Sequence, residues 1–263
     1  MGSSVWSESV YLDAVAPDGA LAFVARLGRY PSTRTAWAWA HVFTPDGCVE
    51  FVDDHYPCTS DVVAVEEPDA TYAAGDVRFH RTGPRDAIAR GDLSMRVGTL
   101  AIDATFTPRR VLQGAGNLPG RTEEHGSVSV RATWPRGGLA LDALGQWHEQ
   151  HQDTPRFTVP FTYLTVRGVD LSIVAIIGPK ASGGIVRRDD VGARATAVRV
   201  GPRSATRELV VDLDDGSVLH GSLTTTYDYA VPINGTPRPG TIVTGTLDGH
   251  LVSGCVNDWV PPS

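Results

Sequence analysis

A repeating pattern of short apolar segments and turns runs from Val10 almost to the C-terminus. Segments of five to ten residues, rich in Val, Leu, Thr and aromatic side chains, are each followed by a turn that contains Gly, Pro, Asp or Asn. Such regular spacing is typical of antiparallel strands joined by hairpins. It predicts an all-β protein. The clearest turn signals are Pro17-Asp18-Gly19, Pro45-Asp46-Gly47, Arg167-Gly168, Asp214-Asp215-Gly216, Asn234-Gly235 and Asp248-Gly249.

Helix signals are scarce, and one segment interrupts the strand pattern. Only Pro84 to Arg90 reads as a helical turn, with Pro at a tolerated first position and Gly91 after its end. The stretch from Gln113 to Gly126 is polar and glycine-rich, which is typical of a connection. We therefore expect two consecutive antiparallel units of barrel or sandwich type, residues 1–124 and 125–263, with very little helix.

Composition indicates a soluble globular protein. The chain has 263 residues, of which 41% are hydrophobic, enough to bury a substantial core. No apolar run approaches the ~20 residues that a membrane-spanning helix needs. The N-terminus lacks the basic and apolar regions of a secretory signal, so a cytoplasmic location is expected.

Charge and cysteine patterns exclude several other classes of protein. The net charge is −7, and the short basic pairs Arg109-Arg110 and Arg187-Arg188 do not form the clustered stripe of a nucleic-acid surface. The three cysteines have no paired spacing, so neither a disulfide framework nor a structural zinc site is predicted. No dinucleotide fingerprint, P-loop or serine elbow occurs in the sequence.

An aromatic row is predicted on the segment from Ala36 to Phe43. Successive side chains of a strand point to opposite faces, which places Trp37, Trp39 and His41 together on one face. Two indoles and an imidazole suit the wall of an apolar ligand cavity. Ordinary core packing would produce the same pattern.

The segment from Leu141 to Gln152 is the main candidate for chemistry. Read as a strand, it places Trp147, Glu149 and His151 on one face and His148 on the other. An indole beside a carboxylate in a pocket desolvates the charged form, which favours a general acid, and a nearby imidazole can serve as base or partner. A solvated polar loop is the alternative interpretation. The HxxH spacing of His148 and His151 differs from the HExxH helix pattern, and no third ligand is identified, so no metal is predicted.

Further candidates come from other strands. Arg26 and Arg29 fall on opposite faces of one strand, so at most one of them faces inward to bind a carboxylate or enolate; a surface salt bridge is the alternative. Tyr163 and Tyr227 lie on strands of the second half and are further candidates for substrate binding.

Four segments of the chain resemble a known family: Glu8-Ser9-Val10-Tyr11-Leu12, Arg26-Leu27-Gly28-Arg29-Tyr30-Pro31, Trp37-Ala38-Trp39 and Gly145-Gln146-Trp147-His148-Glu149-Gln150-His151. They look like the lipocalin-like family that includes carotenoid hydratases, kievitone hydratase and natural-product pericyclases (Diels–Alderases). The resemblance implies two packed lipocalin-like β units, a largely apolar pocket and catalysis without a cofactor. In place of the Asp-His that many relatives show after the aromatic residue, this chain has Glu149 followed by Gln150.

Together the site and the resemblance favour an enzyme that cyclises, hydrates or isomerises a hydrophobic polyketide or terpenoid. The pocket would hold a flexible substrate in a reactive conformer, while Glu149 polarises a carbonyl or protonates an alkene. Two alternatives remain at this stage: a non-catalytic carrier for an apolar small molecule, and a structural sandwich without a pocket. Expected catalytic residues are Glu149, His148 and His151; expected substrate-binding residues are Trp37, Trp39, His41, Trp147, Arg26, Tyr163 and Tyr227.

Overall fold

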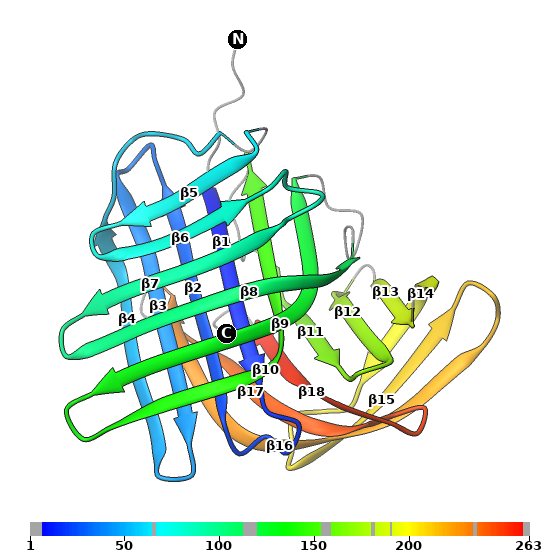
Figure 1. Cartoon of the computed structure of the whole chain (residues 1–263). Helices are drawn as coiled ribbons and strands as arrows, with labels where there is room; N and C mark the ends of the chain where they lie inside the picture. Colours follow the sequence, from blue (N-terminus) through cyan, green and yellow to red (C-terminus); the bar gives the residue numbers. More distant parts are fainter. Residues whose placement is uncertain are drawn as a thin grey trace. The chain divides into compact units, whose positions relative to one another are not determined.

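The computed structural model describes residues 7–64, 67–112, 120–153, 159–179, 182–189, 191–233 and 236–259. Within these ranges the chain forms eighteen β-strands and no helix, which confirms the all-β prediction. No described segment is therefore a helix that could cross a membrane. The strands belong to two antiparallel sheets, one nearly closed and one a closed barrel (Figure 1).

The first unit contains a ten-stranded sheet with the order β4-β3-β2-β1-β10-β9-β8-β7-β6-β5. In Figure 1, strands β5 to β8 run across strands β1 to β4, so the sheet folds over on itself, and β5 returns towards β2. Its strands are β1 (Ser7–Val15), β2 (Ala22–Tyr30), β3 (Thr35–Thr44), β4 (Gly47–Pro57), β5 (Asp69–Ala74), β6 (Val77–Thr82), β7 (Arg90–Val97), β8 (Leu100–Leu112), β9 (Arg121–Trp134) and β10 (Gly137–Gln152).

Long strands β9 and β10 join the two layers of this sheet, and both curve in Figure 1. Their register pairs Gly145 with Gly126. A Cβ atom on Gly145 would lie 2.1 Å from the carbonyl oxygen of Asp13, and one on Gly126 would lie 2.2 Å from that of Thr107. Only glycine permits these close approaches of strand to strand.

The division between the units lies beyond β10. The boundary expected near residue 124 falls within β9, whose pairing with β10 runs unbroken from Arg121 to Trp134. The first unit accordingly includes β10, and the β1–β2 turn is grouped with the second. The polar composition that suggested a connection belongs in part to a strand, because Glu123 to Gly126 line buried positions of β9.

The second unit contains a closed eight-stranded barrel, in which the strands follow one another in chain order and the last pairs with the first. Buried aliphatic side chains, including Leu164, Ile173, Val211 and Leu223, form a core cluster in this barrel. Its strands are β11 (Phe161–Arg167), β12 (Leu171–Ile177), β13 (Ser182–Arg188), β14 (Val191–Val200), β15 (Thr206–Leu213), β16 (Val218–Ile233), β17 (Thr236–Leu247) and β18 (His250–Trp259).

Most of the predicted turns join consecutive strands. Gly19, Gly47, Gly216 and Gly249 have positive φ angles of 71°, 130°, 85° and 81°, the conformation that turns of this kind require. The turn at Asn234-Gly235 lies outside the described residues. The expected helical turn at Pro84 is a single hydrogen-bonded turn, in which the Ala87 amide donates to the Pro84 carbonyl.

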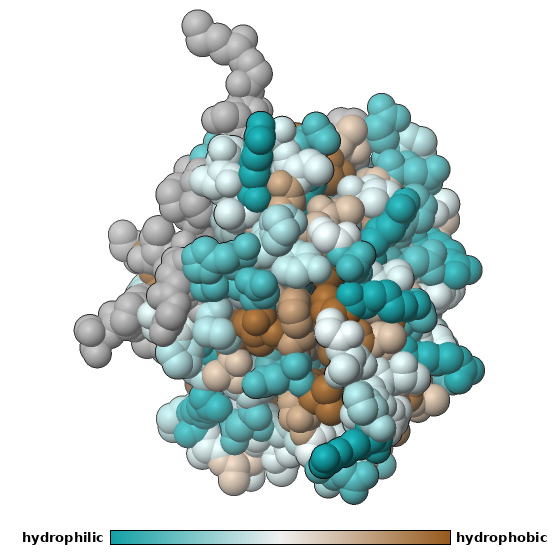
Figure 2. All heavy atoms as spheres, turned by 90° about the vertical axis from the view of Figure 1, so that its left-hand side faces the viewer, coloured by the Kyte–Doolittle hydropathy of each residue, from teal (hydrophilic) through white to brown (hydrophobic). Residues whose placement is uncertain are grey.

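Large apolar side chains are mostly buried. In the described part of the chain, the exposed ones are a few valines and one leucine on strands and loops. Figure 2 shows one face of the molecule, on which hydrophilic side chains surround a limited apolar area. The exposed large apolar residues of the described ranges are Val62, Val159, Val169, Val191, Val218 and Leu251.

Candidate functional site

The candidate site is a set of buried ionisable side chains inside the first unit. Alternation along β10 places Trp147, Glu149 and His151 on the interior face, together with Tyr72 of β5 and Arg81 of β6. Glu8 of β1 and Arg29 of β2 join them from the opposite layer. We call these residues the interior cluster: Glu8, Arg29, Tyr72, Arg81, Glu124, Trp147, Glu149 and His151.

Glu149 is the centre of this cluster and is fully buried. Its Oε1 atom lies 2.9 Å from Arg81 Nε and accepts a hydrogen bond of 2.9 Å from the Trp147 indole. Its Oε2 atom accepts a hydrogen bond of 2.7 Å from the Tyr72 hydroxyl. All three partners are donors, so Glu149 acts as an acceptor that holds Tyr72 and Arg81 in place.

A chain of polar contacts runs from Glu149 to Glu8. Tyr72 Oη lies 2.9 Å from His151 Nε2, and His151 Nδ1 lies 3.9 Å from Glu8 Oε2. Because the tyrosine proton is directed at Glu149, His151 Nε2 carries the hydrogen and Nδ1 faces Glu8 with its lone pair. Burial, with positive charge on Arg85 and Arg81, lowers the pKa of His151 to about 3, so the ring is neutral at neutral pH.

Glu8 is a fully buried carboxyl group whose partners Arg29 and Val63 line a cavity. Burial raises its pKa, and the Val63 amide and the Arg29 guanidinium act in the opposite direction. Val63 donates to Glu8 Oε2 over 2.9 Å, and Arg29 pairs with Oε1. Both Arg29 and Val63 also line a cavity of about 670 Å³ between the loop after β4 and strand β5. The interior cluster therefore reaches the wall of a cavity large enough for a small molecule.

Trp147 packs as a core residue rather than as an open wall. Its ring lies 5.9 Å from the ring of Phe79 and 6.1 Å from that of Phe106. A Cβ atom on Gly91 would lie 2.5 Å from the indole, so β7 gives the ring room by carrying a glycine. Trp147 and Glu149 share one face of β10, as strand alternation predicts. A pocket beside them was expected, and neither of the two cavities described in this section is lined by Trp147 or Glu149.

Glu124 is an interior carboxyl that sequence reasoning missed. It lies opposite Trp147 in the β9–β10 register and is only 1% exposed. The Ile88 amide donates to Oε1 over 3.3 Å, and Oε2 has no hydrogen-bond partner among the described residues. Burial, together with the nearby Glu149 charge, raises the pKa of Glu124 to about 7. The signal available in the sequence was the acidic pair Glu123-Glu124 in a segment that was interpreted as a connection.

The aromatic row of β3 lies on the other face of the sheet. Trp37 and Trp39 have ring centroids 6.1 Å apart, and Trp39 and His41 have centroids 5.7 Å apart, as the alternation predicts. Trp39 also contacts Tyr11 of β1, and Tyr11 and Glu8 point to opposite faces of that strand. Arg26 lies over the Trp37 ring at 4.9 Å, and burial lowers its pKa to about 10. These buried residues face away from the interior cluster.

The remaining predicted site residues are separated from the cluster as well. His148 lies on the outward face of β10, with Nδ1 3.1 Å from the Thr122 carbonyl and 3.6 Å from Glu123 Oε1. Tyr163 and Tyr227 belong to the second unit, where the Tyr227 hydroxyl donates to the Ala20 carbonyl over 2.8 Å. Of the ten predicted residues, the structure thus brings together Trp147, Glu149 and His151.

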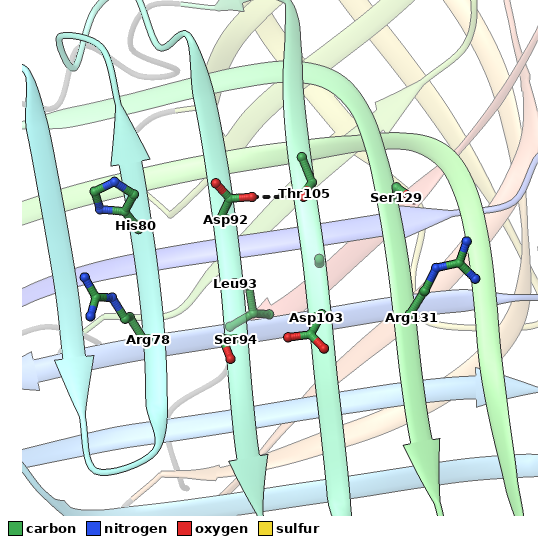
Figure 3. A pocket seen from close by; sticks show the side chains of 10 residues that line it. Arg78, His80, Asp92, Leu93, Ser94, Asp103, Thr105, Ser129 and Arg131 are labelled. Carbon is green, nitrogen blue, oxygen red and sulfur yellow. Dashed lines mark hydrogen bonds between the residues drawn. The ribbon is translucent and has the colours of Figure 1, made fainter.

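A second cavity, of about 380 Å³, lies on the outer face of β6 to β9 and is polar (Figure 3). In Figure 3, the Thr105 hydroxyl donates a hydrogen bond to Asp92, and Arg78 and Arg131 extend from the strands on either side. Asp92 and Asp103 are paired with Arg90 and Arg96. This groove is a network of surface ion pairs. No group of three or more His, Cys, Asp or Glu side chains in the described ranges is arranged to hold a metal ion.

Comparison with known proteins places the chain in a family. A model described as a domain of unknown function, DUF7064, matches residues 1–251. The chain belongs to the DUF7064 family. No curated protein matches the sequence of this DUF7064 protein.

Solved structures with the same fold cover nearly the whole chain. CghA is 14% identical with a TM-score of 0.69, covering 98% of this chain and 89% of its own. CghA has also been solved with Sch210972. A candidate ATTH from Nitrosomonas europaea is 13% identical with a TM-score of 0.71, covering 99% and 95%. Kievitone hydratase from Nectria haematococca is 11% identical with a TM-score of 0.66, covering 98% and 90%. The expected resemblance is therefore confirmed: this DUF7064 protein shares its fold with CghA and kievitone hydratase.

Proposed function

We propose that the chain is a cofactor-independent enzyme that cyclises, hydrates or isomerises an apolar polyketide or terpenoid. The observation that carries this proposal is the position of Arg29, which lines the 670 Å³ cavity and is paired with Glu8 of the interior cluster. Buried, hydrogen-bonded ionisable groups beside a cavity are typical of catalytic sites. The fold shared with kievitone hydratase is consistent with this class of activity.

In this proposal the cavity holds the substrate and the cluster transfers a proton within it. The cavity walls restrict a flexible chain to a reactive conformer, which removes much of the entropic barrier. The Glu8 carboxylate, paired with Arg29, accepts a proton from a carbon next to a carbonyl group or from the attacking water, and returns that proton to a carbon of the product. His151 and Tyr72 connect Glu8 to Glu149 and stabilise the change of charge.

The catalytic set differs from that expected from the sequence. Glu149 and His151 remain in it, as the fixed acceptor and the neutral relay. Glu8 and Tyr72 are added, since Glu8 contacts a residue of the cavity wall and Tyr72 links the two ends of the network. His148 faces the other side of the sheet, so the proposal gives it no part in this site.

A non-catalytic carrier is the second candidate. Small apolar side chains such as Ala70, Val63 and Ala74 line the cavity and suffice to bind a ligand.

Turnover separates the two functions. A panel of polyene ketones and terpenoids is incubated with the protein, and products are followed by liquid chromatography and mass spectrometry. An enzyme gives isomers of unchanged mass or products enlarged by one water.

Variants then connect the turnover to the cluster. Tyr72→Phe removes one hydroxyl from the network and should lower kcat about 10²-fold or more while substrate binding is kept. Tyr229→Phe is the matched control, since it removes a buried hydroxyl that donates to Asn257 in the second unit. Binding without turnover across the panel would favour the carrier, and an unchanged kcat for Tyr72→Phe would remove the cluster from the mechanism.

A further inference from the structure

The cavity beside Arg29 has a mixed lining with one buried charged group. Most of its residues are small or apolar. Apart from Arg29 of β2, the polar ones come from the loop after β4 and from β5. Arg29 is only 3% exposed although it contributes to the wall. The residues are Arg29, Pro57, Cys58, Thr59, Asp61, Val62, Val63, Ala64, Asp69, Ala70, Thr71, Ala73, Ala74 and Gly75.

The guanidinium group of Arg29 is held in one orientation. Its Nη1 atom donates to Glu8, and its Nη2 atom donates to Thr59 Oγ1 over 3.1 Å and to the Asp61 carbonyl over 2.9 Å. Its Nε atom is buried and has no hydrogen-bond partner within the described part of the chain. A fixed, buried and unused N–H donor is costly to leave unpaired, so a ligand atom that accepts a hydrogen bond is expected there.

The charges around the cavity restrict what that ligand atom can be. Glu8 already compensates the positive charge of Arg29. The other charged residues of the wall are Asp61 and Asp69, both acidic. A ligand carboxylate would therefore enter a region of net negative charge, whereas a neutral oxygen would gain the hydrogen bond without that repulsion.

We propose that this cavity recognises an apolar molecule through a neutral carbonyl oxygen, as in a ketone, lactone or amide, which accepts the free Nε hydrogen of Arg29. The inference deepens the proposed function and rests on it for the assignment of the cavity as the substrate site. It names the substrate class: an apolar chain that ends in, or carries, an uncharged carbonyl group.

Three probes with the same carbon chain test this class by ligand-detected NMR titration at pH 8: decan-2-one, decanoate and decylammonium. Decan-2-one is expected to bind at least 10-fold more tightly than either ion. Equal binding of all three, tighter binding of decanoate or decylammonium, or no binding of decan-2-one would overturn the proposal. The assay measures binding alone, so its failure is distinct from a failure to find turnover.

Two variants locate the probe. Ala73→Trp fills the cavity from a half-buried position of β5 and should abolish binding of decan-2-one. Ser94→Trp is the matched control, a half-buried strand position in the outer groove, and should leave binding unchanged. Arg29→Lys keeps the charge opposite Glu8 but lacks the Nε donor, so the preference for decan-2-one should disappear. Retained binding in Ala73→Trp, or retained preference in Arg29→Lys, would overturn the assignment.

Discussion

Replacing Glu124 with Gln should stabilise the protein at alkaline pH. The Glu124 carboxyl is buried in the first unit, where one oxygen accepts the Ile88 amide and the other has no hydrogen-bond partner among the described residues. Burial opposes its ionisation and raises its pKa from 4.5 to about 7. Gln has the same shape, keeps an oxygen for the Ile88 amide and carries no charge.

The pKa difference sets the size of the effect. Because the folded-state pKa is higher than the unfolded one, the folded state binds the proton more tightly, and the resulting stability is present below pH 4.5 and lost as the pH rises through 7. A difference of about 2.5 pH units, at ~1.36 kcal/mol each, corresponds to about 3 kcal/mol. Above pH 8 the wild type carries this whole penalty and Glu124→Gln carries none.

Urea unfolding of the wild type and Glu124→Gln between pH 4 and pH 9 measures the effect. The two proteins should have similar free energies of unfolding at pH 4, and the variant should be more stable by about 3 kcal/mol at pH 9. A difference that does not change with pH, or a variant that is less stable at pH 9, would refute the reasoning about this carboxyl.

Three further predictions concern other parts of the structure. Gly91→Ala should lower the free energy of unfolding by about 1–3 kcal/mol, since its Cβ would lie 2.5 Å from the Trp147 ring; an unchanged urea midpoint would contradict this packing. The pKa of His151 is lowered from 6.5 to about 3, so the neutral ring's contribution to stability is lost as the pH falls from 6.5 towards 3. In urea titrations, the free energy of unfolding of His151→Gln should therefore fall less over this pH range than that of the wild type. Leu223→Ala should destabilise the second barrel by about 2–5 kcal/mol, measured by urea unfolding, while binding of decan-2-one to the first unit is kept; loss of binding in folded protein would argue against independent sites.

Local patterns predicted the strands and their faces well. The period of two along β10 placed Trp147, Glu149 and His151 on one face, because alternation is a property of the strand itself. The glycine and aspartate turns were equally readable, since positive φ angles favour particular residues. The all-β class follows from these two signals together.

The composition of the site was beyond these local patterns. Glu8, Tyr72 and Arg81 lie on strands far from β10 in the sequence. Only the folded sheet shows that they lie near Glu149. The same topology explains why Trp37 and Glu149, both read as facing a pocket, lie on opposite faces of one sheet. Alternation along a strand shows which side chains share a face. It does not show which face of one strand lies on the same side of the sheet as a given face of another strand.

A crystal structure of the protein with decan-2-one bound would be the most direct measurement of the proposed link between cavity and interior cluster. The ketone oxygen should lie within hydrogen-bond distance of Arg29 Nε, with the alkyl chain along Val63 and Ala70. A ketone bound away from Arg29, with the cavity between the loop after β4 and strand β5 still open, would contradict it.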